Sequence, residues 1–378
     1  MTSGLYVHVP FCSAVCPYCD FAVTIAGEAR REAFVNGVVR EAGLVSWSHG
    51  AFDTVYLGGG TPSSLHLDQL VRLLEGVRAA LPVAPAAWTV LEANPEDVTP
   101  ETASAWRQLG VDGVSLGVQS FDDADLRRLG RRHDGRRARS AVDLALEVFG
   151  WISVDLIFGL PGEREATWRQ RIDEAASSGA HHLSCYALTV HDGTLLGRRA
   201  ARGERVAADD DLQGELLRAT HRHLAGLGWD GYEVSNFARE PCHRSRHNRK
   251  YWRHEPYLGL GPSAHSFGGR RRWWNRRKVR LWQDDVDAGR LPVEGEEVLD
   301  DLDLLLERVL LGLRTTEGID LGFMRRRYGV DLARANAARI AAWSNAELVR
   351  LENGRLRPTV AGLTVAEGLA RELELGEG

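Results

Sequence analysis

The chain has 378 residues, with 44% hydrophobic residues, 26% charged residues and a formal net charge of −5, which is typical of a globular protein. Its length predicts two domains, or one large barrel with an appendage. No eighteen consecutive residues are apolar, so we expect no membrane-spanning helix. The first residues lack a basic stretch followed by a long apolar one. We therefore expect no signal peptide and a cytoplasmic protein, where clustered cysteines more often bind metal than form disulfides.

Short apolar, β-branched segments recur along the first half of the chain, and helical patterns lie between them. The predicted strands are residues 5–9, 54–58, 88–93, 113–118, 152–158 and 182–188. Residues 31–45 and 67–81 have apolar positions at the three-to-four spacing of a helix. This alternation predicts an α/β fold, a partial (β/α)6 barrel over residues 1–205. The chemistry of such folds gathers at the carboxyl ends of the strands, and the conspicuous motifs of this chain follow those ends.

The pattern changes after about residue 205. Residues 209–228 are predicted to form a helix, and the polar, aromatic and basic stretch up to about residue 285 is predicted to be irregular, so 206–295 forms a helical and irregular extension. From His243 to Arg280 there are twelve Lys or Arg and a single acidic residue, a run that attracts phosphates, nucleic acid or carboxylates. A helical region begins at Leu299, and Asn353-Gly354 predicts a tight hairpin. These features indicate a winged-helix-like α+β domain over 296–378.

Three of the five cysteines follow the first predicted strand, in "FCSAVCPYCDF". The thiolates of Cys12, Cys16 and Cys19 suit three irons of a four-iron cluster and leave the fourth iron open. Zinc is the main alternative, with Asp20 or His8 as a fourth ligand. Structural zinc sites usually have a second C-x2-C pair, and this sequence contains none.

The pattern C-x3-C-x2-C, with the aromatic Tyr18 before the last cysteine, resembles the signature of the radical S-adenosylmethionine (SAM) superfamily. The resemblance implies a [4Fe-4S] cluster on the three cysteines and SAM chelated to the open iron. "GGGTP", "EANPE", "GVQSF", "LGRRH" and "VDLIFGLPG" fit the same family. The SAM contacts that the resemblance implies are Tyr6, Tyr18, Gly59, Gly60, Thr61, Glu92, Gln119, Arg131 and Asp155. Carboxylates and amides suit the ribose hydroxyls and the ammonium of SAM, and arginine suits its carboxylate; taken singly, these polar residues are as often helix caps or surface ion pairs.

Within the superfamily the chain resembles the oxygen-independent coproporphyrinogen oxidase group, through "YVHVPFC", "YLGGGTPS", "SLGVQSF" and "YEVSNFA". True oxidases of that group carry a further cysteine where this chain has Phe21, and they have a longer N-terminal arm. "HNRKYW" is similar to the HNxxYW stretch of the heme-chaperone (HemW-type) branch. The resemblance implies heme binding by His247, Tyr251 and Trp252. Other candidate ligands of the heme iron are Cys242, His243, His254 and His265.

Three functions follow from these patterns. The favoured one is a chaperone that binds heme and the SAM-ligated cluster and delivers heme to acceptor hemoproteins, such as respiratory enzymes, at the membrane periphery. In that case the cluster governs homodimerisation or heme handover, or supports turnover. The second is a coproporphyrinogen oxidase, against which Phe21 counts, so enzymatic activity stays open. The third is an RNA-modifying radical enzyme, suggested by the basic, Trp-rich residues 268–280; nucleic acid is not the expected partner.

Overall fold

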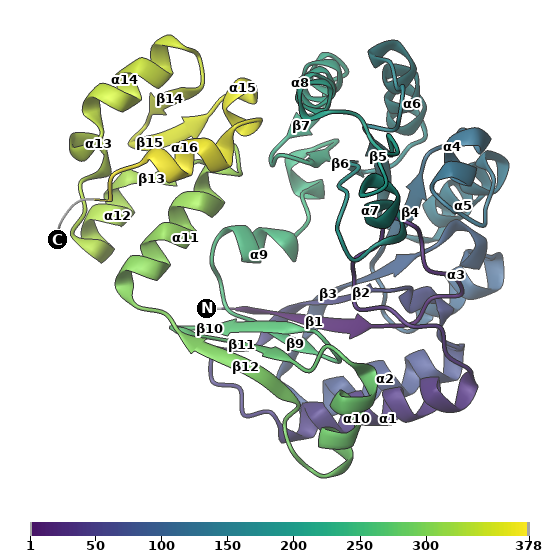
Figure 1. Ribbon diagram of the computed structural model, residues 1–378. Coiled ribbons are helices and arrows are strands. Elements are labelled where there is room, and N and C mark those ends of the chain that lie inside the picture. Colours follow the sequence, from purple (N-terminus) through teal and green to yellow (C-terminus); the bar gives the residue numbers. More distant parts are fainter. Residues whose placement is uncertain (1, 376–378) are drawn as a thin grey trace.

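A computed structural model describes residues 2–375, which form one 12-stranded sheet and one 3-stranded sheet (Figure 1). Six parallel strands follow one another across the large sheet in chain order. They are β1 (Ser3–Val9), β2 (Phe52–Gly59), β3 (Val83–Ala93), β4 (Gly113–Gln119), β5 (Trp151–Phe158) and β6 (His182–Ala187). Five of them contain a predicted strand in full and β6 contains all but Leu188 of the sixth, so the predicted parallel α/β architecture is confirmed.

Helices connect these strands and cover the outer face of the curved sheet (Figure 1). They are α1 (Glu28–Leu44), α2 (Leu67–Ala80), α3 (Pro100–Gln108), α4 (Asp123–Arg128), α5 (Gly135–Val148), α6 (Glu165–Ser177), α7 (Leu195–Ala200) and α8 (Asp210–Gly226), with 3-10 turns η1 (Pro62–Ser64) and η2 (Pro95–Asp97). In α2 the buried residues Leu70, Leu73, Leu74 and Val77 recur every three or four positions, so one stripe of the helix packs on the sheet. None of the helices in residues 2–375 is long and apolar enough to span a bilayer.

Residues 230–298 differ from the irregular structure expected there, because much of this segment extends the barrel sheet at both edges. On one edge β8 (Asn236–Ala238) pairs antiparallel with β6, followed by β7 (Asp230–Gly231). On the other, β9 (Tyr257–Leu260) runs parallel to β1 and leads to β10 (His265–Gly268), β11 (Arg271–Asn275) and β12 (Val293–Val298). These strands have two to six residues. β8 and β9 join the sheet through partners far away in the chain, β6 and β1, so local sequence patterns do not reveal their place in the sheet.

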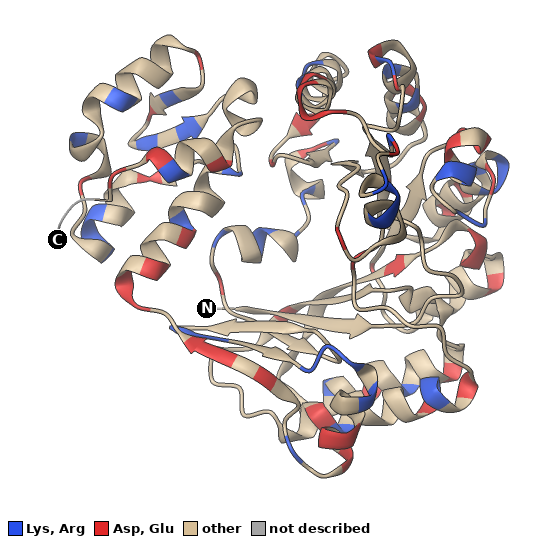
Figure 2. Ribbon diagram, in the orientation of Figure 1, with Lys and Arg blue, Asp and Glu red and all other residues tan. Residues whose placement is uncertain are grey.

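The basic run of this segment is largely neutralised by carboxylates. Arg271 pairs with Glu296 and Arg272 with Glu297 across β11 and β12, and Figure 2 shows the acidic residues along β12. The remaining elements of the segment are η3 (Pro241–His243), α9 (Asn248–Trp252) and α10 (Val279–Asp287). Because eight of the twelve basic residues form ion pairs, the segment offers nucleic acid less free positive charge than its sequence suggests.

The C-terminal residues form a domain with its own buried core. Its elements are α11 (Asp301–Leu313), β13 (Ile319–Asp320), α12 (Leu321–Tyr328), α13 (Leu332–Ala335), α14 (Ala337–Asn345), β14 (Val349–Glu352), β15 (Arg355–Pro358), α15 (Val360–Leu363) and α16 (Ala366–Glu372). The predicted hairpin turns at Asn353 and Gly354, whose φ angles are 51° and 72°, values typical of a two-residue hairpin turn.

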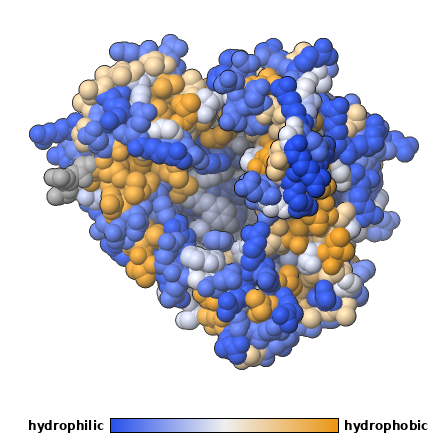
Figure 3. All heavy atoms as spheres, in the orientation of Figure 1, coloured by the Kyte–Doolittle hydropathy of each residue, from blue (hydrophilic) through white to orange (hydrophobic). Residues whose placement is uncertain are grey.

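Between this domain and the barrel the surface is hollowed (Figure 3), and α9 lies there in the ribbon view. A cavity of about 290 Å³ is lined by Arg249, Trp252 and Arg253 from the α9 region and by Phe323 and Met324 from α12. Helix α9 is therefore in contact with both parts of the chain.

A buried carboxylate on α1 ties the late strands to the barrel. Glu41 accepts hydrogen bonds from the backbone N–H of Gly261 (2.8 Å), Asn275 Nδ2 (2.5 Å) and Trp282 Nε1 (3.0 Å). Burial raises the pKa of Glu41 to about 8, although the three donors oppose this. One side chain thus orders three segments more than 200 positions away in sequence.

The raised pKa of Glu41 predicts a pH-dependent stability. The folded protein holds a proton on Glu41 that the unfolded chain loses above about pH 4.3. The free energy of unfolding of the wild type should therefore fall as pH rises from about 4.5 to about 8, by at most about 1.4 kcal/mol per pH unit. In Glu41→Gln, the free energy of unfolding should lack this contribution to its pH dependence. Urea unfolding of both proteins at several pH values measures the difference, and Glu75→Gln on the exposed face of α2 is the control. Parallel curves for wild type and Glu41→Gln would contradict the expectation.

Candidate cluster and cofactor site

A cavity of about 430 Å³ lies at the carboxyl ends of the parallel strands. Its walls come from the loop after β1 and from the ends of β2 to β6. This is the rim on which the sequence motifs were expected to meet. Of the predicted cluster and SAM residues, those that line it are Cys12, Cys16, Tyr18, Cys19, Gly59, Gly60, Thr61, Glu92, Gln119, Arg131 and Asp155.

The three cysteines occupy one loop as half-buried free thiols. Thr61 Oγ1 donates to Cys12 Sγ at 3.4 Å, and Arg131 Nη1 donates to Cys16 Sγ at 3.5 Å. Burial raises the pKa of Cys12 and raises that of Cys19 to about 11, so binding a metal releases protons from these thiols. Three sulfur donors beside an open cavity fit a [4Fe-4S] cluster with one iron available to a ligand.

The side chains proposed as a fourth zinc ligand are engaged elsewhere. His8 Nδ1 lies 3.1 Å from the Tyr6 hydroxyl, and His8 Nε2 lies 3.0 Å from the carbonyl oxygen of Ala22. Asp20 is exposed and its carboxylate lies 3.6 Å from His191 Nδ1. A zinc site would have to break one of these contacts, whereas a three-cysteine cluster site breaks none.

The glycine triplet at the end of β2 allows the backbone to pass directly beneath the cysteine loop. Gly60 N–H donates to the carbonyl oxygen of Val9 at 2.8 Å. A Cβ on Gly60 would lie 2.8–2.9 Å from backbone atoms of Val9, Pro10 and Phe11. Gly59 has a φ of 109°, a conformation that residues with a side chain rarely adopt.

The charged side chains that line the cavity include the two predicted carboxylates, Glu92 and Asp155. Glu92 accepts from the Tyr56 hydroxyl (2.9 Å) and from Gly59 N–H (3.0 Å), and burial together with the charge of Asp155 raises the pKa of Glu92 to about 7. Asp155 accepts from Ser115 and Ser153, and burial raises its pKa.

Arg131 is the predicted cationic residue of the site, and Arg132 lines the same cavity. Its Nη2 donates to the carbonyl oxygen of Gly117 (2.9 Å) and to Asn94 Oδ1 (2.5 Å). Its Nε is buried and has no hydrogen-bond partner among the described residues. A buried, unused N–H donor beside a cavity fits an anionic group such as a carboxylate of a bound ligand.

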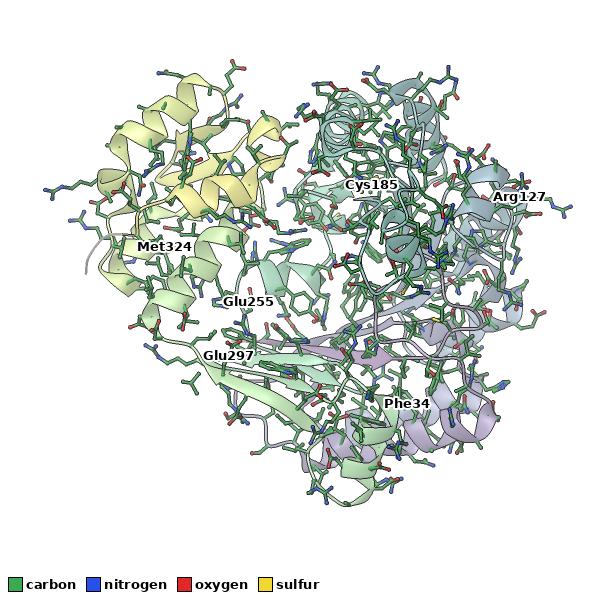
Figure 4. The ribbon with its side chains drawn as sticks, in the orientation of Figure 1. Phe34, Arg127, Cys185, Glu255, Glu297 and Met324 are labelled. Carbon is green, nitrogen blue, oxygen red and sulfur yellow. The ribbon has the colours of Figure 1, made fainter. Side chains whose placement is uncertain are left out.

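Tyr6 is the predicted SAM residue that the structure places elsewhere. Its ring lines a second cavity of about 420 Å³, which shares Asp20, Phe21, Gly59 and Glu92 with the first. The first cavity is also lined by polar residues that were not among the predicted site residues, which are Asn94, Ser115, Ser153, His182, Ser184 and Tyr186. They lie on β4 to β6 or directly after β3, so the polar positions of the predicted strands are the signal that would have found them. Cys185, labelled in Figure 4, is fully buried on β6.

The predicted heme residues point in two directions from α9. His247 is buried; its Nδ1 lies 2.9 Å from Thr54 Oγ1 and its Nε2 lies 2.7 Å from the Tyr251 hydroxyl. Its ring stacks on Tyr56 with centroids 5.1 Å apart, and burial lowers its pKa to about 3. Tyr251 lines the second cavity. Trp252 faces the C-terminal domain instead, with its ring centroid 5.7 Å from that of Tyr232.

The other candidate iron ligands lie in different surroundings. His254 lies 2.8 Å from Glu307. His265 is exposed and stacks on Trp274. Cys242 is exposed and His243 is half-buried on the turn η3.

Comparisons with known proteins agree with this fold. The model of the radical SAM superfamily matches residues 6–175, and that of the HemN C-terminal domain matches residues 299–365. The solved structure of coproporphyrinogen III oxidase (HemN) from Escherichia coli, a radical SAM enzyme, superposes with a TM-score of 0.83 at 20% identity, covering 98% of this chain and 89% of that one. At that identity the likeness concerns the fold, and the fold is that of a radical SAM protein.

Curated relatives define the family more closely. The heme chaperone HemW of Mycobacterium tuberculosis is 37% identical over 376 residues, which cover 98% of this chain and 94% of that protein. The heme chaperone HemW of Bacillus subtilis is 31% identical over 331 residues, covering 86% and 87%. The chain therefore belongs to the HemW family within the radical SAM superfamily.

Gly60→Ala should reduce cluster loading, because the added Cβ meets backbone atoms of the loop that carries Cys12. We expect iron per chain after anaerobic reconstitution to fall several-fold, and stability to fall by about 1–3 kcal/mol. Gly27→Ala is the matched control, since a Cβ there has no atom within 4 Å and the φ angle is −78°. Full iron loading of Gly60→Ala would show that the loop does not depend on this close approach.

The affinity for SAM should depend on pH through Glu92. Because the pKa of Glu92 is about 7, the carboxylate is mostly neutral at about pH 6 and ionised at about pH 8, and the ionised form accepts hydrogen bonds more strongly. SAM affinity, measured by equilibrium dialysis on the cluster-loaded protein, should rise up to about tenfold over this interval. Glu92→Gln should flatten the change, whereas Glu101→Gln on α3 should keep it. Equal pH profiles for wild type and Glu92→Gln would contradict the assignment.

Proposed function

We propose that this protein is a heme chaperone that holds a SAM-ligated [4Fe-4S] cluster, binds heme beside α9 and delivers it to acceptor hemoproteins. The relatives that match nearly the whole chain are named heme chaperones. The observation that carries the proposal is the position of the HNxxYW segment. Tyr251 of this segment lines a second cavity that adjoins the cavity of the three cysteines, and its hydroxyl lies 2.7 Å from Nε2 of the buried His247.

The second cavity has the chemistry of a porphyrin site. Tyr6, Tyr251 and Tyr257 offer flat aromatic faces, and Arg277 offers a guanidinium. Aromatic rings pack well against a macrocycle, and arginine pairs with carboxylates such as propionates. The volume of about 420 Å³ suits part of a heme, with one edge toward solvent. Trp252 then supports α9 from its other side through its contact with Tyr232.

His247 is the proposed ligand of the heme iron. Its lowered pKa keeps the imidazole neutral at physiological pH, which is the form that binds a metal. Coordination through Nε2 requires the Tyr251 hydroxyl to release that nitrogen. Thr54 would continue to orient the ring through Nδ1, as partners of the second nitrogen do in metal sites.

In this proposal the cluster site holds the cluster on its three cysteines and SAM beside them. The bound cluster and SAM supply one-electron chemistry at the open iron. Glu92 and Asp155 are placed to accept hydrogen bonds from bound SAM, and Arg131 to donate them. This chemistry has three alternative roles, which are turnover, homodimerisation and heme handover. The state of the protein from which heme is released distinguishes these roles. Respiratory hemoproteins are the proposed acceptors.

Heme titration tests the proposal on the anaerobically reconstituted full chain, followed by absorbance. We expect near-stoichiometric binding by the wild type and at least a tenfold loss of affinity, about 1.4 kcal/mol, or an altered spectrum for His247→Ala. Tyr251→Phe keeps the ring but frees Nε2, so it should bind at least as tightly as the wild type. His223→Ala on α8, outside the residues that line the two cavities, is the matched control.

Each other outcome has a defined meaning. Equal binding by wild type and His247→Ala would move the iron ligand to Cys242, His243, His254 or His265. Absence of specific binding by the wild type would overturn the chaperone proposal. The coproporphyrinogen oxidase alternative is then tested by anaerobic product analysis, where the exposed Phe21 at the mouth of the cavity leads us to expect no decarboxylation.

A further inference from the structure

Three potential metal ligands converge on the turn η3, outside the residues that line the two cavities. One ligand atom from each of Glu240, Cys242 and His243 lies within 4.8 Å of the others. Pro241 begins this turn, and the Cys242 thiol lies 3.7 Å from Glu240 Oε2. A sulfur, a nitrogen and an oxygen donor thus share one face of a short, rigid segment.

The adjacent histidine gives a second, independent observation. The rings of His181 and His243 are 4.7 Å apart and nearly perpendicular, with an interplanar angle of 69°. The Nδ1 atom of each is buried and has no hydrogen-bond partner within residues 2–375. Buried polar atoms are almost always paired, so two unpaired imidazole nitrogens side by side point to a missing ligand.

The donor set selects the kind of ion. Thiolate and imidazole favour borderline-soft transition metals such as Zn²⁺ over Ca²⁺ or Mg²⁺, which prefer oxygen. A single cysteine is too few for an iron–sulfur cluster. The 4.8 Å span is wider than the ligand spacing of a tetrahedral zinc site, which is about 3.5 Å for these bond lengths. The exposed Glu240 and Cys242 side chains are free to close it.

The two arginines beside the turn η3, Arg239 and Arg244, already have other partners. Arg239 donates to the carbonyl oxygen of Ala176 at 2.9 Å and lies over the Trp229 ring. Arg244 forms an ion pair with Asp230 at 2.7 Å. Because both guanidinium groups are held by other partners, they leave the three donors open to a cation.

We propose that Glu240, Cys242 and His243 form a transition-metal site of the Zn²⁺ class, with His181 as the nearest fourth ligand. The site goes beyond the heme function proposed above and does not depend on it. It lies on the connection between β8 and α9, so a bound ion would fix the segment that carries His247.

Alkylation of Cys242 in the full-length, cluster-loaded protein tests this site. There the cluster occupies Cys12, Cys16 and Cys19, and Cys185 is buried, so Cys242 is the accessible thiol. We expect Zn²⁺ to slow its reaction with iodoacetamide at least tenfold, as followed by peptide mass spectrometry. His243→Ala should abolish most of this protection and Glu240→Gln or His181→Ala part of it, whereas the exposed His265→Ala should leave it unchanged.

Cobalt(II) gives a spectroscopic readout that alkylation does not. Its difference spectrum should show thiolate-to-cobalt charge transfer in the wild type and lose it in Cys242→Ser. Zn²⁺ protection that persists in His243→Ala would overturn the site, and so would protection of Cys242 by heme without protection by Zn²⁺. Loss of heme binding in His247→Ala with intact Zn²⁺ protection would separate this site from the proposed heme site.

Discussion

The close backbone contact between the end of β1 and the end of β2 is the constraint on which the candidate site depends. Gly60 N–H bonds to the carbonyl oxygen of Val9, and the space around Gly60 has no room for a Cβ. The cysteine loop begins only two residues beyond Val9, so this contact fixes where its first thiol points. A parallel pair of strands thereby places three soft ligands over the carboxyl ends of the sheet, where Glu92, Arg131 and Asp155 converge.

The same strand also positions the proposed heme segment. β1 pairs with β2 on one side and with β9 on the other. His247 anchors α9 against β1 and β2, because it meets Thr54 on β2 and packs over Gly4 on β1. Glu41 holds β9 and the following segment from behind, through Gly261 and Asn275. The cluster loop and α9, separated by more than 200 residues, are therefore fixed to opposite ends of one strand.

The sequence was sufficient for whatever is encoded locally. Six parallel strands, the cysteine loop, the glycine triplet and the Asn353-Gly354 hairpin all carry short-range signals, namely β-branched runs, fixed spacings and turn residues. The place of β9 to β12 in the sheet is not encoded in this way, because β9 joins it by pairing with β1 and β10 to β12 follow by antiparallel pairing and cross-strand ion pairs such as Arg272 with Glu297. The burial of His247 between Thr54 and Tyr251 was equally hidden, since a motif states which residues recur and not which nitrogen atoms are already bonded. The unpaired imidazoles of His181 and His243 come from distant elements and appear only once β6 and β8 have paired.

A continuous set of contacts connects the two cavities. Glu92 accepts the Tyr56 hydroxyl, the Tyr56 ring stacks on His247, and His247 Nε2 meets the Tyr251 hydroxyl. A ligand that binds Glu92 differently in two states changes the hydrogen-bond acceptor of the Tyr56 hydroxyl. It thereby changes the position of the Tyr56 ring, on which His247 stacks. Spatial continuity alone does not establish coupling; that requires an element with two arrangements whose balance both ligands shift. Tyr251 meets that description under the proposed function, because its hydroxyl and the heme iron compete for the same nitrogen. The free energy with which SAM changes heme affinity must then equal the free energy with which heme changes SAM affinity. Glu92 lines both cavities, and the chain of three aromatic side chains leads from it to the proposed iron ligand.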